Sequence, residues 1–253
     1  MQISRTLRSA DDLRRVALTT LSLLALAGTT AGAQQPTATT PGDTRPTVAV
    51  MYFTNGALVG NADYAPLSKG MAEMMIAELA RNPAIRVVER DRLQQLIAEQ
   101  NLGSGDRVDK ETAIKLGKIL GAHHLLMGAF VIDPKQNMRI DVRSVNTETS
   151  QIEYVETITG KTEQLLGLVD QLGAKVNAGL KLPPLPSGTK ELGVNAPAGP
   201  GQFRAMMLVS RALEQQDRGN VQEAIALYKG ALAIYPEFDR AKSLLASLER
   251  RAS

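Results

Sequence analysis

The sequence predicts an α/β fold, a mixed-sheet sandwich with the element order β-α-β-α-α-β-β-β-α, followed by a small C-terminal all-α unit. Three observations predict it. The run TVAVMYF, Thr47–Phe53, is almost entirely apolar, which is typical of a strand covered on both faces. Segments with a helical spacing of apolar residues follow it up to Gly121. Three strand-like runs with short polar turns then lie between His123 and Ile158, which indicates antiparallel neighbours.

The first 33 residues have the pattern of a secretory signal peptide. Four arginines precede an apolar run from Val16 to Gly28, and small residues stand at Ala31-Gly32-Ala33. The run is well short of the ~20 apolar residues that span a bilayer, so we expect a cleaved signal and no spanning segment in the mature chain. Residues 34–45, rich in Thr and Pro, are expected to form a flexible leader.

The composition argues against several classes of function. Removal of the four basic and two acidic residues of the signal lowers the net charge from +3 to about +1, and aromatic residues make up only 4% of the chain. A nucleic-acid groove needs positive charge and stacking rings, so we expect no nucleic-acid partner. The chain has no Cys, which excludes disulfides, thiolate nucleophiles, thiolate metal sites and a lipidated N-terminal Cys. We expect no cofactor.

A helix is expected between Pro66, which is tolerated in a first turn, and the stop signal Asn82-Pro83. Its apolar residues share one methionine-rich face, made by Leu67, Met71, Met74, Met75 and Leu79. A methionine stripe can be a promiscuous binding surface, but at helical spacing beside a strand it favours the core. Ile85–Glu89 is the second expected strand.

The most unusual stretch is the charged corner Glu89-Arg90-Asp91-Arg92, which joins this strand to a helix. Asp91 is placed as the helix N-cap and Gln94 as the other half of a capping box, so we expect a structural corner. Alternation along the strand puts Glu89 on its apolar face. We therefore expect a partly buried Glu89 carboxylate held by Arg90, Arg92 or backbone N–H groups, with catalytic use as the alternative.

Asp109 is expected to cap a further helix that ends at Gly121, after a loop over Asn101–Arg107. His123 and His124 are the only histidines in the chain. Adjacent strand residues point to opposite faces, so this pair cannot hold one metal ion, and no G-x-S-x-G elbow accompanies it. We expect no catalytic, cofactor-binding or metal-binding residues. The alternative uses Glu89 with one histidine, because open α/β sheets place ligands at strand ends.

Three strands and a helix complete the sheet region. His123–Ile132 is nearly all apolar, Met138–Val142 alternates, and Ile152–Ile158 follows a polar turn. The outward positions of the middle strand are expected to be Arg139, Asp141 and Arg143. Apolar residues at helical spacing then predict a helix over residues 162–180.

The chain closely resembles the periplasmic domain of the CsgG family, which includes the curli secretion channel and FlgO-like and TolB-N-terminal-like domains. Four segments carry the resemblance in the right order: TVAVMYF, IRVVERDRLQQLIAEQNL, AHHLLMGAFV and MRIDVRSVNTETSQIEYVETITG. The strand-to-helix corner VVERDRLQQLIAEQ is the most specific of these. The resemblance implies an α/β sandwich over residues 46–180 that is not an enzyme and that assembles into rings or docks on envelope partners.

Two departures from the family argue against a pore made by this chain. The family's channels are lipoproteins, whereas this chain has no Cys. The channels also insert membrane hairpins whose strands need ~9–11 residues, but the connection Asp133–Asn137 is too short and the stretch after Gly160 leads directly into a helix. A pore subunit that borrows its hairpins from another protein is the weakest alternative.

The C-terminal part is expected to be a separate helical unit. Residues 181–202 are rich in Pro and Gly and are expected to form a linker. Within residues 203–253, Ala205–Phe238 resembles one tetratricopeptide repeat, whose expected interaction residues are Leu208, Ala212, Ala224, Tyr228, Ala231 and Pro236. A single repeat leaves an apolar face uncovered. The third helix, Asp239–Arg250, the α/β domain or another protein must cover that face.

Together these observations favour a non-enzymatic periplasmic or outer-membrane-associated protein, related to the curli secretion and assembly component. We expect a scaffold or assembly factor that contacts envelope proteins, with self-association into a homo-oligomer and peripheral membrane association as open options. The alternative function is a periplasmic small-molecule-binding or hydrolytic α/β domain.

Overall fold

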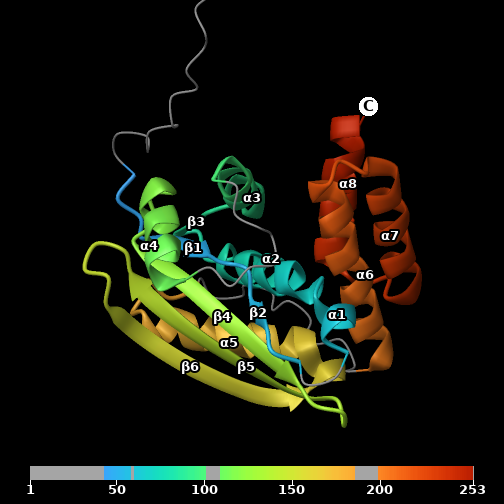
Figure 1. Ribbon diagram of the computed structural model, residues 1–253, viewed down its shortest axis with the longest axis horizontal. Helices are drawn as coiled ribbons and strands as arrows, with labels where there is room; N and C mark the ends of the chain where they lie inside the picture. Colours follow the sequence, from blue (N-terminus) through green and yellow to red (C-terminus); the bar gives the residue numbers. More distant parts are fainter. Residues whose placement is uncertain (1–42, 58–59, 101–108, 186–198, 253) are drawn as a thin grey trace, which may run out of the picture. The chain divides into compact units, whose positions relative to one another are not determined.

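Parallel strands form one side of the sheet. The computed structural model describes residues 43–57, 60–100, 109–185 and 199–252, all in one compact unit. Strand β1 (Thr47–Val50) pairs in parallel with β3 (Arg86–Val87) on one side and with β4 (His124–Ile132) on the other (Figure 1). Every residue of β1 is buried, as its continuous apolar sequence predicts.

The prediction of a single strand over Thr47–Phe53 is wrong at the C-terminal end of that segment. Strand β1 stops at Val50, and a separate short strand, β2 (Thr54–Asn55), joins β4 further along. The Phe53 N–H donates to the carbonyl of Ser68, at the start of the helix Leu67–Leu79, instead of to β4. The Phe53 ring lies over Gly128 of β4, where an added Cβ would overlap it.

Strands β4, β5 (Asn137–Asn146) and β6 (Ile152–Lys161) are antiparallel, as the short turns predict. Strands β5 and β6 are longer than the segments predicted for them, Met138–Val142 and Ile152–Ile158. Among the described residues the strand order is β3-β1-β4-β5-β6, with β2 beside β4, so β6 forms one edge of the six-stranded sheet (Figure 1).

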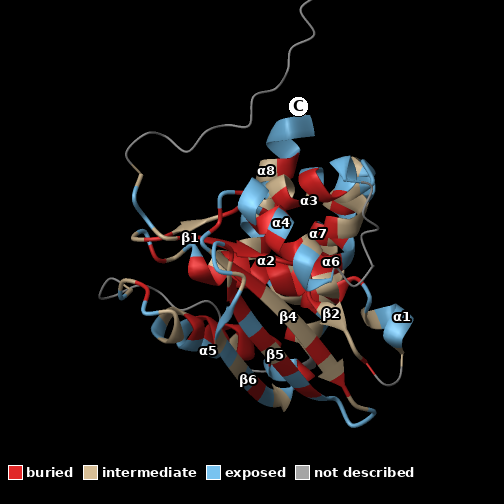
Figure 2. Ribbon diagram, turned by 60° about the vertical axis from the view of Figure 1, so that its left-hand side comes forward, coloured by how far each residue is buried: buried red, intermediate tan, exposed pale blue. Residues whose placement is uncertain are grey.

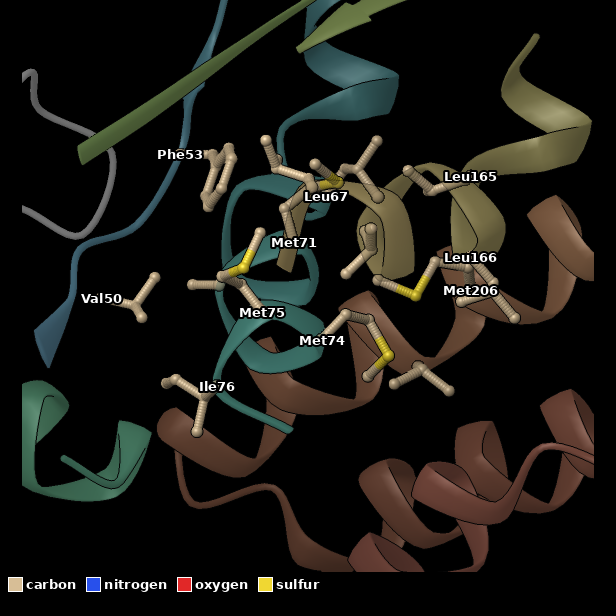
Figure 3. Packing of buried hydrophobic residues seen from close by; sticks show 14 of the residues in the cluster. Val50, Phe53, Leu67, Met71, Met74, Met75, Ile76, Leu165, Leu166 and Met206 are labelled. Carbon is tan, nitrogen blue, oxygen red and sulfur yellow. The ribbon is translucent and has the colours of Figure 1, made fainter. Parts of the chain in front are cut away.

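Helices α2 (Leu67–Leu79) and α5 (Leu165–Gly179) cover one face of the sheet; α1 (Asn61–Tyr64) precedes α2 and the 3₁₀ turn η1 (Thr162–Gln164) precedes α5. The methionine-rich stripe of α2 is buried, as predicted: Leu67, Met71, Met74, Met75 and Leu79. It packs between the sheet residues and the side chains of α5 and of the C-terminal helices (Figure 3). Figure 2 shows α2 buried along nearly its whole length.

Helices α3 (Arg90–Glu99) and α4 (Lys110–Ile119) pack on the opposite face, where a second, smaller apolar cluster joins them to β1 and the start of β4. Asp109 caps α4, as predicted, because its carboxylate accepts the Thr112 N–H at 2.9 Å. The outer face of β5 is polar, with Arg139 and Arg143 exposed and Asp141 half-buried.

Three C-terminal helices complete the described part: α6 (Pro200–Asp217), α7 (Val221–Ile234) and α8 (Asp239–Ala252). Helix α6 begins at Pro200, so the last three residues of the predicted linker, 200–202, are helical. It packs closely against α2 at Gly70, where an added Cβ would overlap the Ser210 side chain and lie 2.8 Å from Met206 Cε. One apolar cluster joins α6, α7 and α8 to α2, α5 and the sheet.

The α/β fold class with a helical C-terminal part is therefore confirmed. Four predictions lie outside the described residues, or mostly so: the signal peptide, the leader over residues 34–45, the loop Asn101–Arg107 and most of the linker over residues 181–202.

Candidate functional site

The charged corner differs in detail from its prediction. Glu89, not Asp91, is the N-cap of α3, and no side chain there makes a capping hydrogen bond. Asp91 lies in the first turn, and Gln94 accepts a hydrogen bond from the Tyr52 hydroxyl at 2.7 Å instead of completing a capping box. The prediction of a partly buried Glu89 carboxylate is also wrong, since Glu89 is exposed. The buried member of the corner is Arg90, which is 3% exposed.

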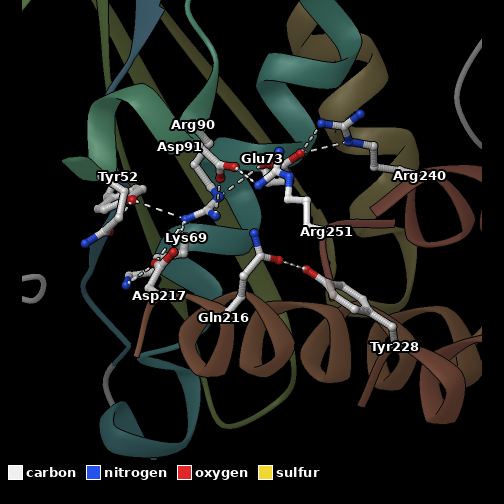
Figure 4. Close-up of polar contacts among 11 residues, drawn as sticks. Tyr52, Lys69, Glu73, Arg90, Asp91, Gln216, Asp217, Tyr228, Arg240 and Arg251 are labelled. Carbon is white, nitrogen blue, oxygen red and sulfur yellow. Dashed lines mark hydrogen bonds and ion pairs between the residues drawn. The ribbon is translucent and has the colours of Figure 1, made fainter. Parts of the chain in front are cut away.

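Arg90 is the centre of a buried ionic cluster made by four side chains from three helices: Lys69 and Glu73 of α2, Arg90 of α3, and Asp217 of α6 (Figure 4). Arg90 Nη1 lies 2.7 Å from Asp217 Oδ1 and 3.0 Å from Asp217 Oδ2. Lys69 Nζ lies 2.6 Å from the same carboxylate, and Arg90 Nε lies 3.3 Å from Glu73 Oε2. Two cations and two carboxylates make this ionic cluster neutral.

Further side chains from the last helix close the rim of the ionic cluster. The Arg240 guanidinium donates two hydrogen bonds to Glu73 Oε1, one of them from Nε at 2.8 Å. Asp91 accepts from Arg90 Nη2 at 2.7 Å with one oxygen and from Arg251 Nη1 at 2.8 Å with the other. Glu73 and Asp91 of the α/β part therefore each bind an arginine of α8, and Asp217 of α6 binds Arg90 and Lys69.

Burial controls the electrostatics of this site. Burial alone would lower the pKa of Arg90, but the neighbouring Asp217 carboxylate, with Tyr52 and Glu73, outweighs it and raises the pKa above its usual range. Burial raises the pKa of the Tyr52 hydroxyl well above its usual value, although Arg90 opposes that shift. The Lys69 ammonium also lies 5.5 Å from the centre of the Tyr52 ring, within the range of a cation–π contact.

The two histidines lie apart from Glu89, and each has a contact of its own. His123 Nδ1 accepts the Thr47 N–H at 3.2 Å, and His124 Nδ1 lies 2.6 Å from Glu153 Oε1. Both precede or begin β4, whereas Glu89 follows β3, and β1 lies between those strands. In the described part of the chain, no group of three or more potential ligand side chains is placed to hold a metal ion.

A cavity of about 900 Å³ lies where β1 ends beside β4, on the side of Met51, Tyr52, Met127 and Ala129. Open α/β sheets bind ligands at the carboxyl ends of their strands, at the point in the sheet where the strand order reverses. Arg143 and Asp141 line its outer wall. This cavity is distinct from the ionic cluster except for Tyr52 and Lys69, which border both.

The predicted interaction residues of the C-terminal part are mostly internal. Ala212, Ala224, Tyr228 and Ala231 are fully buried, Leu208 is half-buried and Pro236 is exposed. The Tyr228 hydroxyl donates to Gln216 Oε1 at 3.2 Å, which joins α7 to α6 (Figure 4). The apolar face of α6 lies against α2, so the α/β part of the same chain covers it.

Sequence reasoning missed the partners of Arg90. Asp217 is 127 positions away, and no local pattern connects the two residues. A weaker signal existed in α2, where Lys69 and Glu73 stand among the apolar residues of a helix that is buried on nearly all sides. Charged residues are almost never fully buried unless they are paired, so these two positions could have indicated a buried ion pair.

The comparisons with known proteins agree with the sequence resemblance. Residues 29–133, less than half of the chain, match the family model of the curli production assembly/transport component CsgG. The resemblance to that family is confirmed over these residues, while the tetratricopeptide likeness of the C-terminal helices stays a prediction. No curated protein matches the chain.

Several solved structures are similar at low identity. The LpoB C-terminal domain from Salmonella enterica is 13% identical, with 46% of this chain and 82% of that chain covered and a TM-score of 0.35. Lipoprotein GNA1162 from Neisseria meningitidis is 13% identical, with 46% and 79% covered and a TM-score of 0.35. The PelC dodecamer from Paraburkholderia phytofirmans is 14% identical, with 53% and 88% covered and a TM-score of 0.31. Likeness at this level carries no argument about function.

The helices in the described ranges include none that is both long and apolar enough to cross a membrane.

Proposed function

We propose, from the match of residues 29–133 to the CsgG family model, that the protein is a non-enzymatic cell-envelope protein that acts as a scaffold or assembly factor. One observation supports the proposal above the others. The buried charged side chains of the site, Arg90 above all, form ion pairs that join α3 and α2 to α6. Groups that are already paired and buried in this way hold helices together.

We propose that the protein lies in the periplasm or is associated with the outer membrane. The support is the signal-peptide pattern of the first 33 residues together with the family match. Contacts with envelope proteins, rather than a spanning segment, hold it there in this proposal.

The C-terminal helices serve this function as a fixed part of one body. Because α2 covers the apolar face of α6, an envelope partner contacts the remaining surface of the helices, where Pro236 and the ends of α7 and α8 are exposed. The buried residues Ala224, Tyr228 and Ala231 position that surface without touching the partner.

Cell fractionation combined with crosslinking in living cells tests the proposal. The wild-type chain should be found in the envelope fraction and should crosslink to a defined envelope protein. Asp217→Leu, which opens the ionic cluster, should weaken that crosslink, whereas Glu89→Gln on the exposed N-cap should leave it unchanged. A cytoplasmic location, or a catalytic turnover that Glu89→Gln abolishes, would contradict the proposal.

The cavity beside β1 and β4 favours a second candidate, the binding of a small molecule. Its volume of about 900 Å³ is in the range of ligand sites, and its lining combines apolar side chains with Arg143 and Asp141. Native mass spectrometry of the purified chain should detect a retained ligand in this case. Ala129→Phe, which fills the cavity, should release it. A ligand-free mass for the wild type would remove this candidate.

A further inference from the structure

The charged side chains that line the cavity beside β1 and β4 differ in whether they have partners. Of the carboxylates, Asp109 caps α4, and Asp141 accepts hydrogen bonds from Arg139 Nη2 and from the Thr157 hydroxyl, each at 2.7 Å. Within the described ranges, no hydrogen bond or ion pair engages the side chains of three other lining residues: Lys110, Arg143 and Glu214. The cavity therefore has two uncompensated cations and one uncompensated carboxylate.

These three charges lie on different walls of the cavity. Lys110 begins α4 and Arg143 belongs to β5, whereas Glu214 belongs to α6. Lys69 of α2 also lines the cavity, but Asp217 balances its charge at a distance of 2.6 Å. An anion in the cavity is therefore attracted to the wall made by α4 and β5 and repelled by the wall made by α6.

Apolar side chains lie next to Arg143. In the paired strands this residue stands between Met127 of β4 and Val155 of β6, so the three side chains share one face of the sheet. Val155 is 62% exposed, and Met127 packs against the smaller apolar cluster. Phe53, from the chain between β1 and β2, adds a buried ring to the same lining. A ligand whose charged group meets Arg143 therefore has an apolar surface beside it.

We propose that this cavity binds a carboxylate that carries an apolar body. The planar guanidinium of Arg143 can donate two parallel N–H bonds, which match the two oxygens of a carboxylate, and Lys110 adds a second cation. The apolar body lies over Met127 and Val155 and extends toward Phe53. This proposal rests on the second candidate function, the binding of a small molecule in this cavity, and names the class of that molecule.

Isothermal titration calorimetry of the chain with decanoate provides the first test. The wild type should bind decanoate and should not bind decylamine, which has the same chain length and the opposite charge. Arg143→Gln should weaken decanoate binding by about tenfold or more, the effect of losing a charge-assisted pair of hydrogen bonds. Arg143→Lys keeps the charge but not the planar fork, so it should lose less affinity than Arg143→Gln.

Arg250→Gln is the matched control for the loss of one positive charge. Arg250 is exposed on α8 and does not line the cavity, so this variant should bind decanoate as the wild type does. Arg143 is also exposed, so neither substitution should change the fold. Equal urea midpoints for the wild type and the two variants check this.

A titration with ω-aminodecanoate tests where the apolar body lies. This molecule adds an ammonium to the far end of decanoate, so it should bind more weakly than decanoate, because the ammonium would lose its water against an apolar lining. If it bound more tightly, and Glu214→Gln removed that gain, the far end of the ligand would meet Glu214. The apolar body would then be wrong, and the cavity would suit a zwitterion.

The outcomes separate this proposal from small-molecule binding as such. The ligand class is overturned if decanoate does not bind, if decylamine binds as tightly, or if Arg143→Gln binds decanoate as the wild type does. In native mass spectrometry, a retained ligand without a carboxylate would leave small-molecule binding in place and overturn the class. A ligand-free mass together with absent decanoate binding would remove both. None of these results bears on the envelope location or the partner crosslink that tests the scaffold function.

Discussion

Arg90 Nη1 lies 2.7 Å from Asp217 Oδ1, although 127 positions separate the two residues in the chain. Arg90 begins α3 at the end of a strand, and Asp217 ends α6 in the C-terminal part. Their contact is buried, and Lys69 and Glu73 of α2 complete it. The charged corner is therefore one of the points at which the α/β part and the C-terminal helices are joined, beside the apolar contact of α6 with α2.

Loss of one member of the ionic cluster should lower the stability of the fold. Asp217→Leu removes the carboxylate that Arg90 and Lys69 share and leaves two buried cations without it. We expect a loss of about 3–5 kcal/mol in the free energy of unfolding, measured by urea denaturation. Glu89→Ala, one position from Arg90 but exposed, should change it by less than about 0.5 kcal/mol. Equal midpoints for the two variants would contradict a buried ionic cluster.

Replacement of the whole ionic cluster should have a different effect. The variant with Lys69→Met, Glu73→Leu, Arg90→Met and Asp217→Leu exchanges four buried charges for apolar side chains of similar size. Such exchanges range from neutral to stabilising by about 1–4 kcal/mol, because the desolvation cost of the charges disappears. Thermal unfolding should therefore occur near the wild-type temperature or above it. A fourfold variant less stable than Asp217→Leu would show that the charges themselves stabilise the fold.

The close contact between α2 and α6 provides a prediction about packing. A side chain at Gly70 would overlap Ser210 and press on Met206, so Gly70→Val should destabilise the chain by about 1–3 kcal/mol. Gly167 in α5 has open space around its Cβ position, so Gly167→Ala should stabilise by about 0.5–1 kcal/mol. Urea denaturation of both variants checks this pair. A tolerated Gly70→Val would mean that α6 does not lie against α2.

Tyr154 gives a prediction about pH. Burial, together with the hydrogen bond that its hydroxyl donates to Glu156, raises the pKa of Tyr154 to about 12. A free tyrosine has a pKa of about 10, so the folded state holds this proton more tightly than the unfolded state. The resulting stability is fully present below about pH 10 and is lost as the pH rises through about 12.

Tyr154→Phe should remove that pH dependence. Urea midpoints of the wild type and of the variant should converge between about pH 10 and pH 12, because only the wild type loses this contribution there. Phenolate absorbance in the near ultraviolet should also show one late-titrating tyrosine fewer in the variant. Parallel midpoint curves would show that Tyr154 titrates normally.

Local patterns predicted those parts of the fold that depend on neighbouring residues. The methionine-rich stripe of α2 follows from helical spacing beside a strand, and the Asp109 cap of α4 follows from the residue type at a helix start. The antiparallel strands follow from short turns. In each case the atoms that decide the structure lie within a few positions of one another.

The charged corner could not be predicted in the same way. Asp91 has the residue type of an N-cap, but Arg90 and Arg251 of α8 bind its carboxylate, and the cap position passes to Glu89. Arg90 is buried because Asp217 is there to pair with it. These contacts depend on where α6 and α8 pack, and no spacing within the corner records that.

Native-state hydrogen exchange tests most directly whether the ionic cluster makes the described chain one cooperative body. We predict that the slowest amides of α7 and α8 exchange with the same free energy of opening as those of β4 and β5, and that Asp217→Leu lowers both together. If α7 and α8 exchanged through an opening that left β4 and β5 protected, the C-terminal helices would be an independent unit and the account would be wrong.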